Sequence, residues 1–118
     1  MDKALWKKDP VDHDFEAAYE YLSLLFEPDA AKKFVSKLKD SKTTARKAKD
    51  ILRASKLSDL PKSNIHVREN LVKIAQGEKL SPILLVRTED GLIIADGYHR
   101  VCTIYYKSED LEIPCRLI

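Results

Sequence analysis

Apolar side chains in the first half of the chain recur at the spacing of α-helices, with polar side chains between them. Residues three or four positions apart share one face of a helix, and that face normally packs on the core. The two series are Phe15, Ala18, Tyr19, Leu22, Leu25 and Phe26, and then Phe34, Val35 and Leu38. Asp12 or Asp14 could cap the first helix, and the Glu-Pro-Asp segment at 27–29 separates it from the second. We expect both helices to face the core rather than a ligand.

A third helix is predicted from about residue 43 to residue 55, because apolar residues between Ala45 and Leu52 share one face. Another face carries the basic residues Lys42, Arg46, Lys49, Arg53 and Lys56. This stripe has two interpretations, contact with phosphate or nucleic acid and a solvated helix face. We favour the solvated face, because the rest of the chain is not basic. Arg46 is still a candidate phosphate contact, since a helix packed on the sheet could direct it at a ligand.

The segments around these helices differ in character. Residues 1–10 are charged and predicted to be loose, with Trp6 as the only aromatic residue. Helical spacing returns between Val67 and Ala75, and Gly77 is placed to end that fourth helix.

The pattern changes to short strands after residue 80. Residues 83–86 form a continuous apolar run, which is typical of a strand covered on both faces. The Asp-Gly pair within 89–91 favours a hairpin, residues 92–95 supply its second strand, and residues 113–118 form the last strand. We therefore predict one α+β domain over residues 1–118, with a helical N-terminal extension over 1–60 that packs on a small mixed sheet within 61–118.

Residues 96–100 read Asp-Gly-Tyr-His-Arg and join an apolar strand to a predicted helix. Gly97 permits a tight turn because it lacks a Cβ. The free N–H groups of a helix start suit a phosphate, to which Arg100 and His99 could also donate. Each side chain has a structural interpretation as well: Asp96 as a helix cap, Arg100 in an ion pair with Asp96 or a C-terminal acid, and His99 as a packed histidine. Because the residues occur together on one glycine turn, we favour a phosphate site.

Asp96 and His99 are the candidate catalytic residues of this turn. Asp96 could hold Mg²⁺ on a bound nucleotide, or it could act as a base toward a substrate hydroxyl, the role that a kinase needs. The sequence leaves these two roles open. Cys102, on the same predicted helix, is expected to be a small core residue rather than a nucleophile.

The same turn carries a resemblance. Residues 97–100, between the strands at 81–86 and 113–118, resemble the signature of the ParB/sulfiredoxin-like superfamily, which includes the ParB-like nuclease domain. The motif is most similar in form to the Asp-Gly-x-x-Arg element of its free serine kinases. The resemblance covers roughly residues 71–118. It implies the small mixed sheet of that superfamily, here preceded by an N-terminal helical segment, and a nucleotide near the junction at 77–82. The phosphate-binding residues that it implies are Lys79, Ser81, Gly97, Tyr98, His99 and Arg100. For Lys79 and Ser81, a role in the linker is an equal alternative.

Two departures limit what the resemblance implies. Sulfiredoxins carry a reactive cysteine just before the His-Arg pair, and this position is Tyr98, so sulfiredoxin activity is not implied. ParB clamp proteins carry a second arginine where His99 stands, and a helix-turn-helix domain downstream, so centromere binding is not implied. A nuclease is less favoured, because the sequence shows no carboxylate cluster for two metal ions.

Composition narrows the classes of function. The 118 residues include 21 basic and 19 acidic residues, and the formal net charge of +2 gives no overall case for nucleic acid. Cys102 and Cys115 lack metal-ligand spacing, so no metal site is predicted. His13 and His66 lack a second histidine at such spacing and are expected to be surface or capping residues. Without a signal peptide or a membrane-spanning segment, we expect a cytoplasmic protein with reduced thiols and no membrane partner.

Two classes of function follow. The first is a nucleotide- or phosphate-binding protein that acts as a nucleotide-dependent phosphotransferase or hydrolase, with ATP, ADP or CTP and Mg²⁺ as expected ligands. The alternative is a non-catalytic module that binds nucleic acid, a phosphorylated ligand or a partner protein through the turn and the basic helix. A homodimer is compatible with the apolar hairpin. The sequence leaves the substrate, the nucleotide base and the oligomeric state open.

Overall fold

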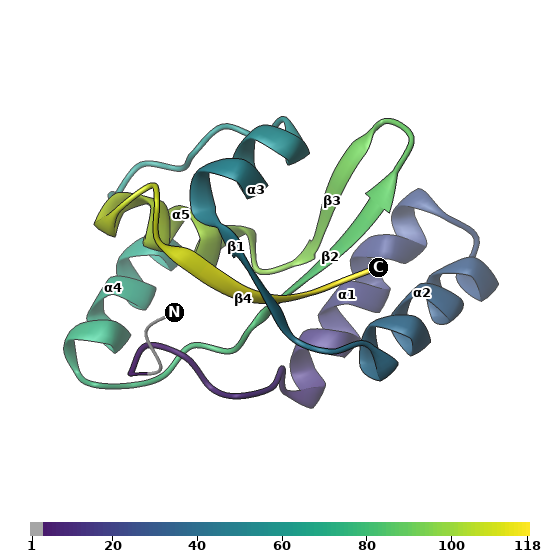
Figure 1. Cartoon of the computed structure of the whole chain (residues 1–118), viewed down its shortest axis with the longest axis horizontal. Coiled ribbons are helices and arrows are strands. Elements are labelled where there is room, and N and C mark those ends of the chain that lie inside the picture. Colours follow the sequence, from purple (N-terminus) through teal and green to yellow (C-terminus); the bar gives the residue numbers. More distant parts are fainter. Residues whose placement is uncertain (1–3) are drawn as a thin grey trace.

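The chain forms five helices and one four-stranded sheet over residues 4–118, which are the residues that the computed structural model describes (Figure 1). The helices are α1 (Asp12–Leu25), α2 (Pro28–Asp40), α3 (Ala48–Ser55), α4 (Ile65–Ala75) and α5 (Tyr98–Lys107). The strands are β1 (Thr44–Lys47), β2 (Ile83–Thr88), β3 (Gly91–Asp96) and β4 (Glu112–Leu117). The predicted α+β class is therefore confirmed.

The sheet is mixed and has the strand order β1-β4-β2-β3. β2 and β3 form an antiparallel hairpin in which Thr88 pairs with Gly91, so the predicted hairpin is confirmed. β4 runs parallel to β2, with Ile83 opposite Cys115, and antiparallel to β1. The chain reaches β4 through α5, which is the kind of helical connection that a parallel strand pair requires.

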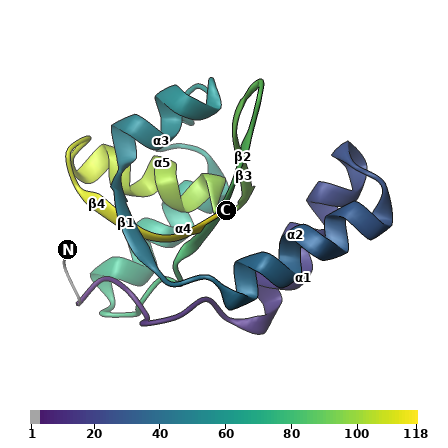
Figure 2. The same cartoon turned by 45° about the vertical axis from the view of Figure 1, so that its right-hand side comes forward.

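Helices cover both faces of the sheet (Figures 1 and 2). α1 and α2 pack on one face, and α3, α4 and α5 contribute to the core on the other. The side chains of β2 alternate between these layers: Ile83 and Leu85 face the α3–α5 layer, and Leu84 and Val86 face α1 and α2. Each of the four is at most 1% exposed. The prediction of a strand covered on both faces is confirmed, and β2 forms the centre of the protein.

The helix predicted over residues 43–55 is wrong in its first part. Residues 44–47 form β1, and α3 begins only at Ala48. β1 pairs with β4, where Arg46 lies opposite Ile113, so pairing with a distant segment overrides the local helical spacing. The basic residues therefore do not share one helical face, because Lys42 precedes β1 and Arg46 lies within it. β1 also lies within residues 1–60, which we expected to be a purely helical extension.

The N-terminal strap, residues 4–10, is not loose as predicted. Trp6 is only 4% exposed and forms a parallel bridge with Leu80. The Lys7 N–H donates to the Leu80 carbonyl at 2.7 Å, and the Leu80 N–H donates to the Leu5 carbonyl at 2.8 Å. The buried Trp6 side chain and these backbone hydrogen bonds hold the charged segment in place. The composition of the segment alone did not indicate this order. Residues 1–3 lie outside the described part of the chain.

The helix ends follow local signals. At α1, the Asp14 carboxylate accepts a hydrogen bond from the Val11 N–H at 2.9 Å, as an acid in the first turn of a helix commonly does. At α4, the Asn64 side chain accepts from two backbone N–H groups of the first turn. Gly77 follows the end of α4 with a φ of +80°, as predicted for its position.

Both cysteines are free thiols in the core, which confirms the core position predicted for Cys102. Cys102 and Cys115 are each 0% exposed, and burial raises the pKa of Cys115 to about 11. A protonated, buried thiol is a poor nucleophile. In residues 4–118, no helix is both long enough and apolar enough to cross a membrane.

Gly97 joins β3 to α5 in a backbone conformation that only glycine adopts readily, with a φ of +113°. A Cβ at this position would lie 2.7 Å from Cβ of Ile83 and would also overlap its Cγ2. The helix therefore starts directly against the central strand, and the absence of a side chain is what permits that approach.

Replacing Gly97 with alanine should destabilise the fold through both backbone strain and overlap with Ile83. We expect a loss of about 3 kcal/mol or more in the free energy of unfolding, measured by urea denaturation. Gly77→Ala is the matched control, because Gly77 also has a positive φ but a Cβ there meets nothing within 4 Å. That control should lose only about 1 kcal/mol. Equal losses in the two variants would contradict the steric role of Gly97.

Candidate functional site

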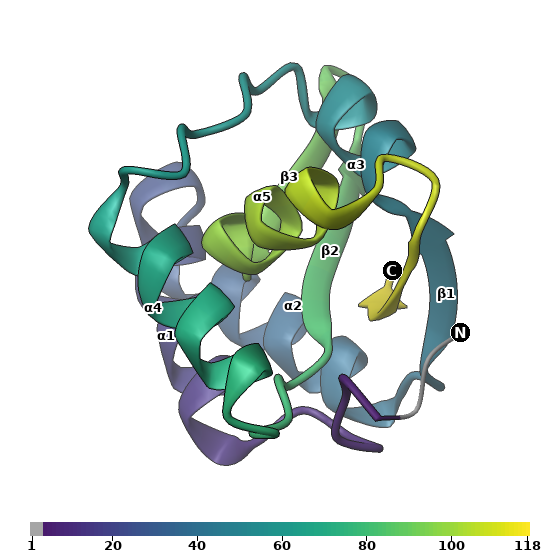
Figure 3. The same cartoon turned by 90° about the vertical axis from the view of Figure 1, so that its left-hand side faces the viewer.

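A polar pocket with a volume of about 360 Å³ lies beside the turn between β3 and α5. The elements that form it are the start of α1, one face of α4 and the first turn of α5, which lie along the same side of the molecule (Figure 3). Its lining residues are His13, His66, Glu69, Asn70, Lys73, Asp96, Gly97, His99 and Arg100. The fold thus brings two segments that are distant in sequence, α1 and α4, to the turn that the sequence singled out.

All three histidines of the chain line this pocket. The rings of His66 and His99 meet edge to face, with their centroids 4.7 Å apart. Considered one at a time, His13 and His66 were expected to be surface or capping residues, so their place in the pocket was missed. The spacing of His66, Asn70 and Lys73 at four and three residues on α4 was a local signal of one polar helix face.

The first turn of α5 has no side-chain cap. Gly97 occupies the capping position, and no side chain of the described residues accepts a hydrogen bond from the first N–H groups there. The structural interpretation of Asp96 as the helix cap is therefore wrong. Because the first N–H groups of a helix lack intrahelical partners, they are available donors and carry the positive end of the helix dipole.

Arg100 connects α1 to this turn through two carboxylates. Its Nη2 lies 2.9 Å from Oδ2 of Asp96 and 3.6 Å from Oδ1 of Asp14. The ion pair with Asp96 is one of the two alternatives that the sequence left open. The Arg100 side chain is 17% exposed, and its Nε is buried with no hydrogen-bond partner among the described residues. The guanidinium is thus partly used by the protein and retains at least one donor without an acceptor.

The environment of Asp96 favours its protonated form. Burial raises the pKa of Asp96 from 3.8 to about 6; the Arg100 guanidinium opposes this rise, and the nearby Asp14 carboxyl adds to it. Because the folded protein binds this proton more tightly than the unfolded chain does, this group lowers stability as the pH rises from 3.8 to about 6. Burial, with the charges of His66 and Arg100, lowers the pKa of His99. Near neutral pH, Asp96 is therefore mostly ionised and His99 mostly neutral.

The other predicted site residues lie elsewhere. The Tyr98 hydroxyl donates to the Ser58 carbonyl and holds the connector between α3 and α4. Ser81 is buried at 8% exposure, and Lys79 lines a separate cleft near the N-terminal strap. Arg46 lines a third hollow with residues of α3 and the β2–β3 hairpin. The prediction that a helix directs Arg46 at the phosphate is wrong, because Arg46 belongs to β1.

Removing each partner of Asp96 should move its pKa in opposite directions. Asp14→Asn should lower the pKa, because a neighbouring carboxyl is lost, and Arg100→Gln should raise it, because a positive charge is lost. We expect shifts of about one unit, measured by NMR titration of the Asp96 carboxyl carbon. Arg53→Gln, which removes an exposed arginine paired with Asp50, should leave the titration unchanged. An Asp96 pKa that is unaffected by both Asp14→Asn and Arg100→Gln would contradict the network.

Comparisons with known proteins do not assign the site. No protein-family model, no curated protein and no solved structure matches the chain. The resemblance of residues 97–100 to the ParB/sulfiredoxin-like superfamily therefore stays a prediction from the sequence, and any function has to be argued from the geometry of the pocket.

Proposed function

We propose that the pocket at the Gly97 turn binds the phosphate of a nucleotide or of another phosphorylated small molecule. The observation that carries this proposal is the uncapped start of α5, whose first residues line a pocket with Lys73, His66 and Arg100. Backbone N–H groups at a helix start bind phosphate oxygens, because they lack other partners and share the positive end of the helix dipole. Cationic side chains beside them add charge-assisted hydrogen bonds. The formal charges of Lys73 and Arg100 are balanced by those of Glu69 and Asp96 in the lining, so the preference for an anion rests on the unpaired N–H groups of the helix start.

ATP, ADP or CTP are the nucleotides that the resemblance implies, and the residues present fit such a ligand. A volume of about 360 Å³ falls within the range of small-molecule sites. Among residues 4–118, Nε of Arg100 finds no acceptor, and a phosphate oxygen would provide one once the guanidinium turned toward the pocket. An unsatisfied buried donor is unfavourable, so a ligand that satisfies it gains affinity. This supports an oxyanion of the ligand close to Arg100.

Mg²⁺ would enter such a site together with the nucleotide. Residues 4–118 contain no group of three His, Cys, Asp or Glu side chains that could hold a metal ion. Nucleotide sites commonly bind Mg²⁺ through one or two carboxylates and the phosphate oxygens. Asp96 and Glu69 both line the pocket and are the carboxylates that would serve. The ion would neutralise phosphate charge and bring the phosphate closer to these acids.

The proposed chemistry is transfer of a phosphoryl group to a substrate hydroxyl or to water. A base near neutrality is most effective when its pKa lies close to the working pH, and the pKa of Asp96 is raised toward that range. The ion pair with Arg100 would hold the Asp96 carboxylate in one orientation. His99, largely neutral because its pKa is lowered, is the second group that could accept the proton.

Nucleotide binding should depend on a cation of α4 that faces the pocket. In calorimetric titrations with ATP, ADP and CTP, with and without Mg²⁺, Lys73→Ala should weaken binding about tenfold through loss of a phosphate contact. Arg68→Ala removes the same charge from an exposed residue of α4 outside the pocket, and it should change the affinity less than about twofold.

No heat with any nucleotide would overturn the proposal, and equal losses in the two variants would reduce it to unspecific charge attraction. Binding without phosphate transfer to a hydroxyl or release to water would favour the non-catalytic alternative.

Anion affinity should also rise as the pH falls. Protonation of Asp96, with its pKa of about 6, removes a negative charge and frees Arg100, and protonation of His99 adds a positive charge. Sulfate is the suitable probe, because its charge is constant over this range. Between about pH 8 and about pH 5, at constant ionic strength, we expect an increase of about tenfold. Asp96→Asn should flatten most of this dependence, and an identical pH profile in that variant would contradict the role of Asp96.

A further inference from the structure

A second cleft, here called the basic cleft, lies between the N-terminal strap, the α2–β1 connector and Lys79. Its volume is about 700 Å³. Its charged lining residues are Lys7, Lys8, Asp9, Lys42, Lys79 and Arg116. None of these residues lines the pocket at Gly97. The basic cleft is therefore separate from the pocket at Gly97. Lys79, which was predicted to contact a phosphate near the turn, lines the basic cleft instead.

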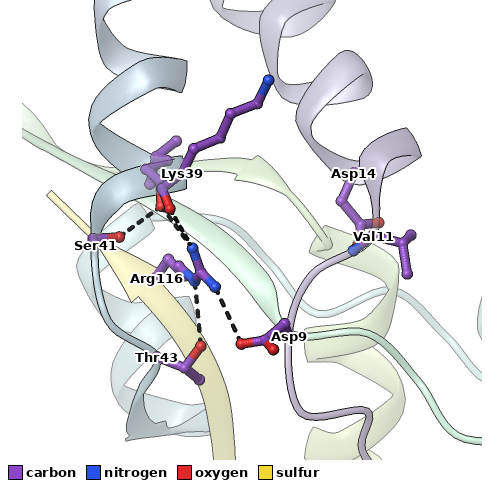
Figure 4. Close-up of polar contacts among 8 residues, drawn as sticks. Asp9, Val11, Asp14, Lys39, Ser41, Thr43 and Arg116 are labelled. Atoms are coloured by element: carbon purple, nitrogen blue, oxygen red, sulfur yellow. Dashed lines mark hydrogen bonds and ion pairs between the residues drawn. The ribbon is translucent and has the colours of Figure 1, made fainter.

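Arg116 of β4 holds the walls of the basic cleft in place (Figure 4). Its Nη1 donates to the carbonyls of Leu38 and Lys39 at the end of α2, at 3.3 and 2.7 Å. Its Nε donates to Thr43 Oγ1 at 3.3 Å, and its Nη2 donates to Asp9 Oδ1 at 3.2 Å. The side chain is 13% exposed. Arg116 thus joins α2, the connector and the strap. Its ion pair with Asp9 also offsets the negative charge of that carboxylate, which would otherwise repel an anion.

Unlike Arg116, the four lysines of the basic cleft form no ion pair with a side chain of the described residues. Lys7, Lys8, Lys42 and Lys79 are exposed, and within residues 4–118 none of their ammonium groups takes part in an ion pair. Their backbones are held, since the strap pairs with Leu80 and the connector is bound by Arg116. The fold therefore places four exposed cations from three distant segments around one cleft.

The charge of the chain is unevenly distributed as a result. Five basic residues and one acidic residue line the basic cleft, which gives it a formal charge of +4, whereas the whole chain carries only +2. The rest of the protein is therefore net negative, at −2. The near balance of the composition hides a concentrated positive site, and such a concentration attracts multiply charged anions.

We propose that the basic cleft binds a small ligand that carries two or more phosphate groups, independently of the pocket at Gly97. The volume of about 700 Å³ suits a small molecule. Lysines act as mobile point charges and tolerate varied phosphate geometry. The only aromatic residue in the lining, Trp6, is 4% exposed and fixed in the core, so it cannot stack a base. Single-stranded nucleic acid normally needs such stacking surfaces, so a compact polyphosphate is favoured over a nucleic acid strand.

Inorganic triphosphate is the probe for this proposal, with orthophosphate for comparison. NMR titration of the ¹⁵N-labelled chain should show saturable shifts of the amides in the strap, of Thr43 and of Lys79. Replacing Lys7, Lys42 and Lys79 together by alanine should weaken triphosphate binding at least about tenfold, because three charge contacts are lost. Orthophosphate should bind at least about tenfold more weakly than triphosphate, because it carries fewer charges.

The matched control replaces Lys33, Lys37 and Lys107 by alanine, which removes the same charge from exposed positions outside both sites. It should change the affinity less than about twofold, and thermal melts should show that both triple variants fold. An equal loss in the control would overturn the proposal, as would shifts only around Gly97, which would instead support the first site. Tighter binding of a DNA or RNA strand than of triphosphate at matched salt would overturn the choice of ligand.

Discussion

The close approach of Gly97 to Ile83 is the constraint on which the arrangement of the protein depends. Ile83 belongs to β2, the strand buried between two helical layers, and Gly97 ends the hairpin and starts α5. Because no Cβ intervenes, β3 bends into α5 directly against the central strand. The first turn of α5 therefore lies at the rim of the core beside α1 and α4, where its residues line a polar pocket. The geometry of the candidate site thus follows from the packing of one glycine.

Arg100 adds an electrostatic link to this steric one. Its guanidinium pairs with Asp96 at the turn and approaches Asp14 on α1, so it connects the helical layer on one face to the helix start on the other. Removing charged groups from water is unfavourable, and this is why two carboxylates next to one guanidinium leave the pKa of Asp96 raised to about 6. Such a network can hold a carboxylate in a fixed orientation and still change its charge near neutral pH. Both properties suit a site that binds and processes an oxyanion.

The two candidate anion sites differ in how they are built. At Gly97, backbone N–H groups and partly buried side chains converge, which suits recognition of a ligand in one orientation. In the basic cleft, four exposed lysines surround a hollow whose walls Arg116 stabilises. Flexible lysines suit recognition of a ligand by its charge more than by its shape. A chain with a net charge of +2 contains a cleft with a formal charge of +4, whereas two acidic and two basic residues line the pocket at Gly97. Net charge alone therefore does not reveal where positive charge is concentrated in this protein.

The sequence by itself determined the features whose signals are local: the turn at Gly97, the hairpin at 89–91, the buried run at 83–86 and most of the helices. It did not determine β1, because residues 44–47 are mostly exposed and become a strand only through pairing with β4. The sequence predicted that Asp96, His99 and Arg100 share one site, since they adjoin one glycine. It did not indicate that His66 lines the same pocket or that Lys79 lines a separate cleft. Those placements depend on which helix faces are buried against the sheet, and burial is a property of the whole packed chain rather than of any short window of sequence.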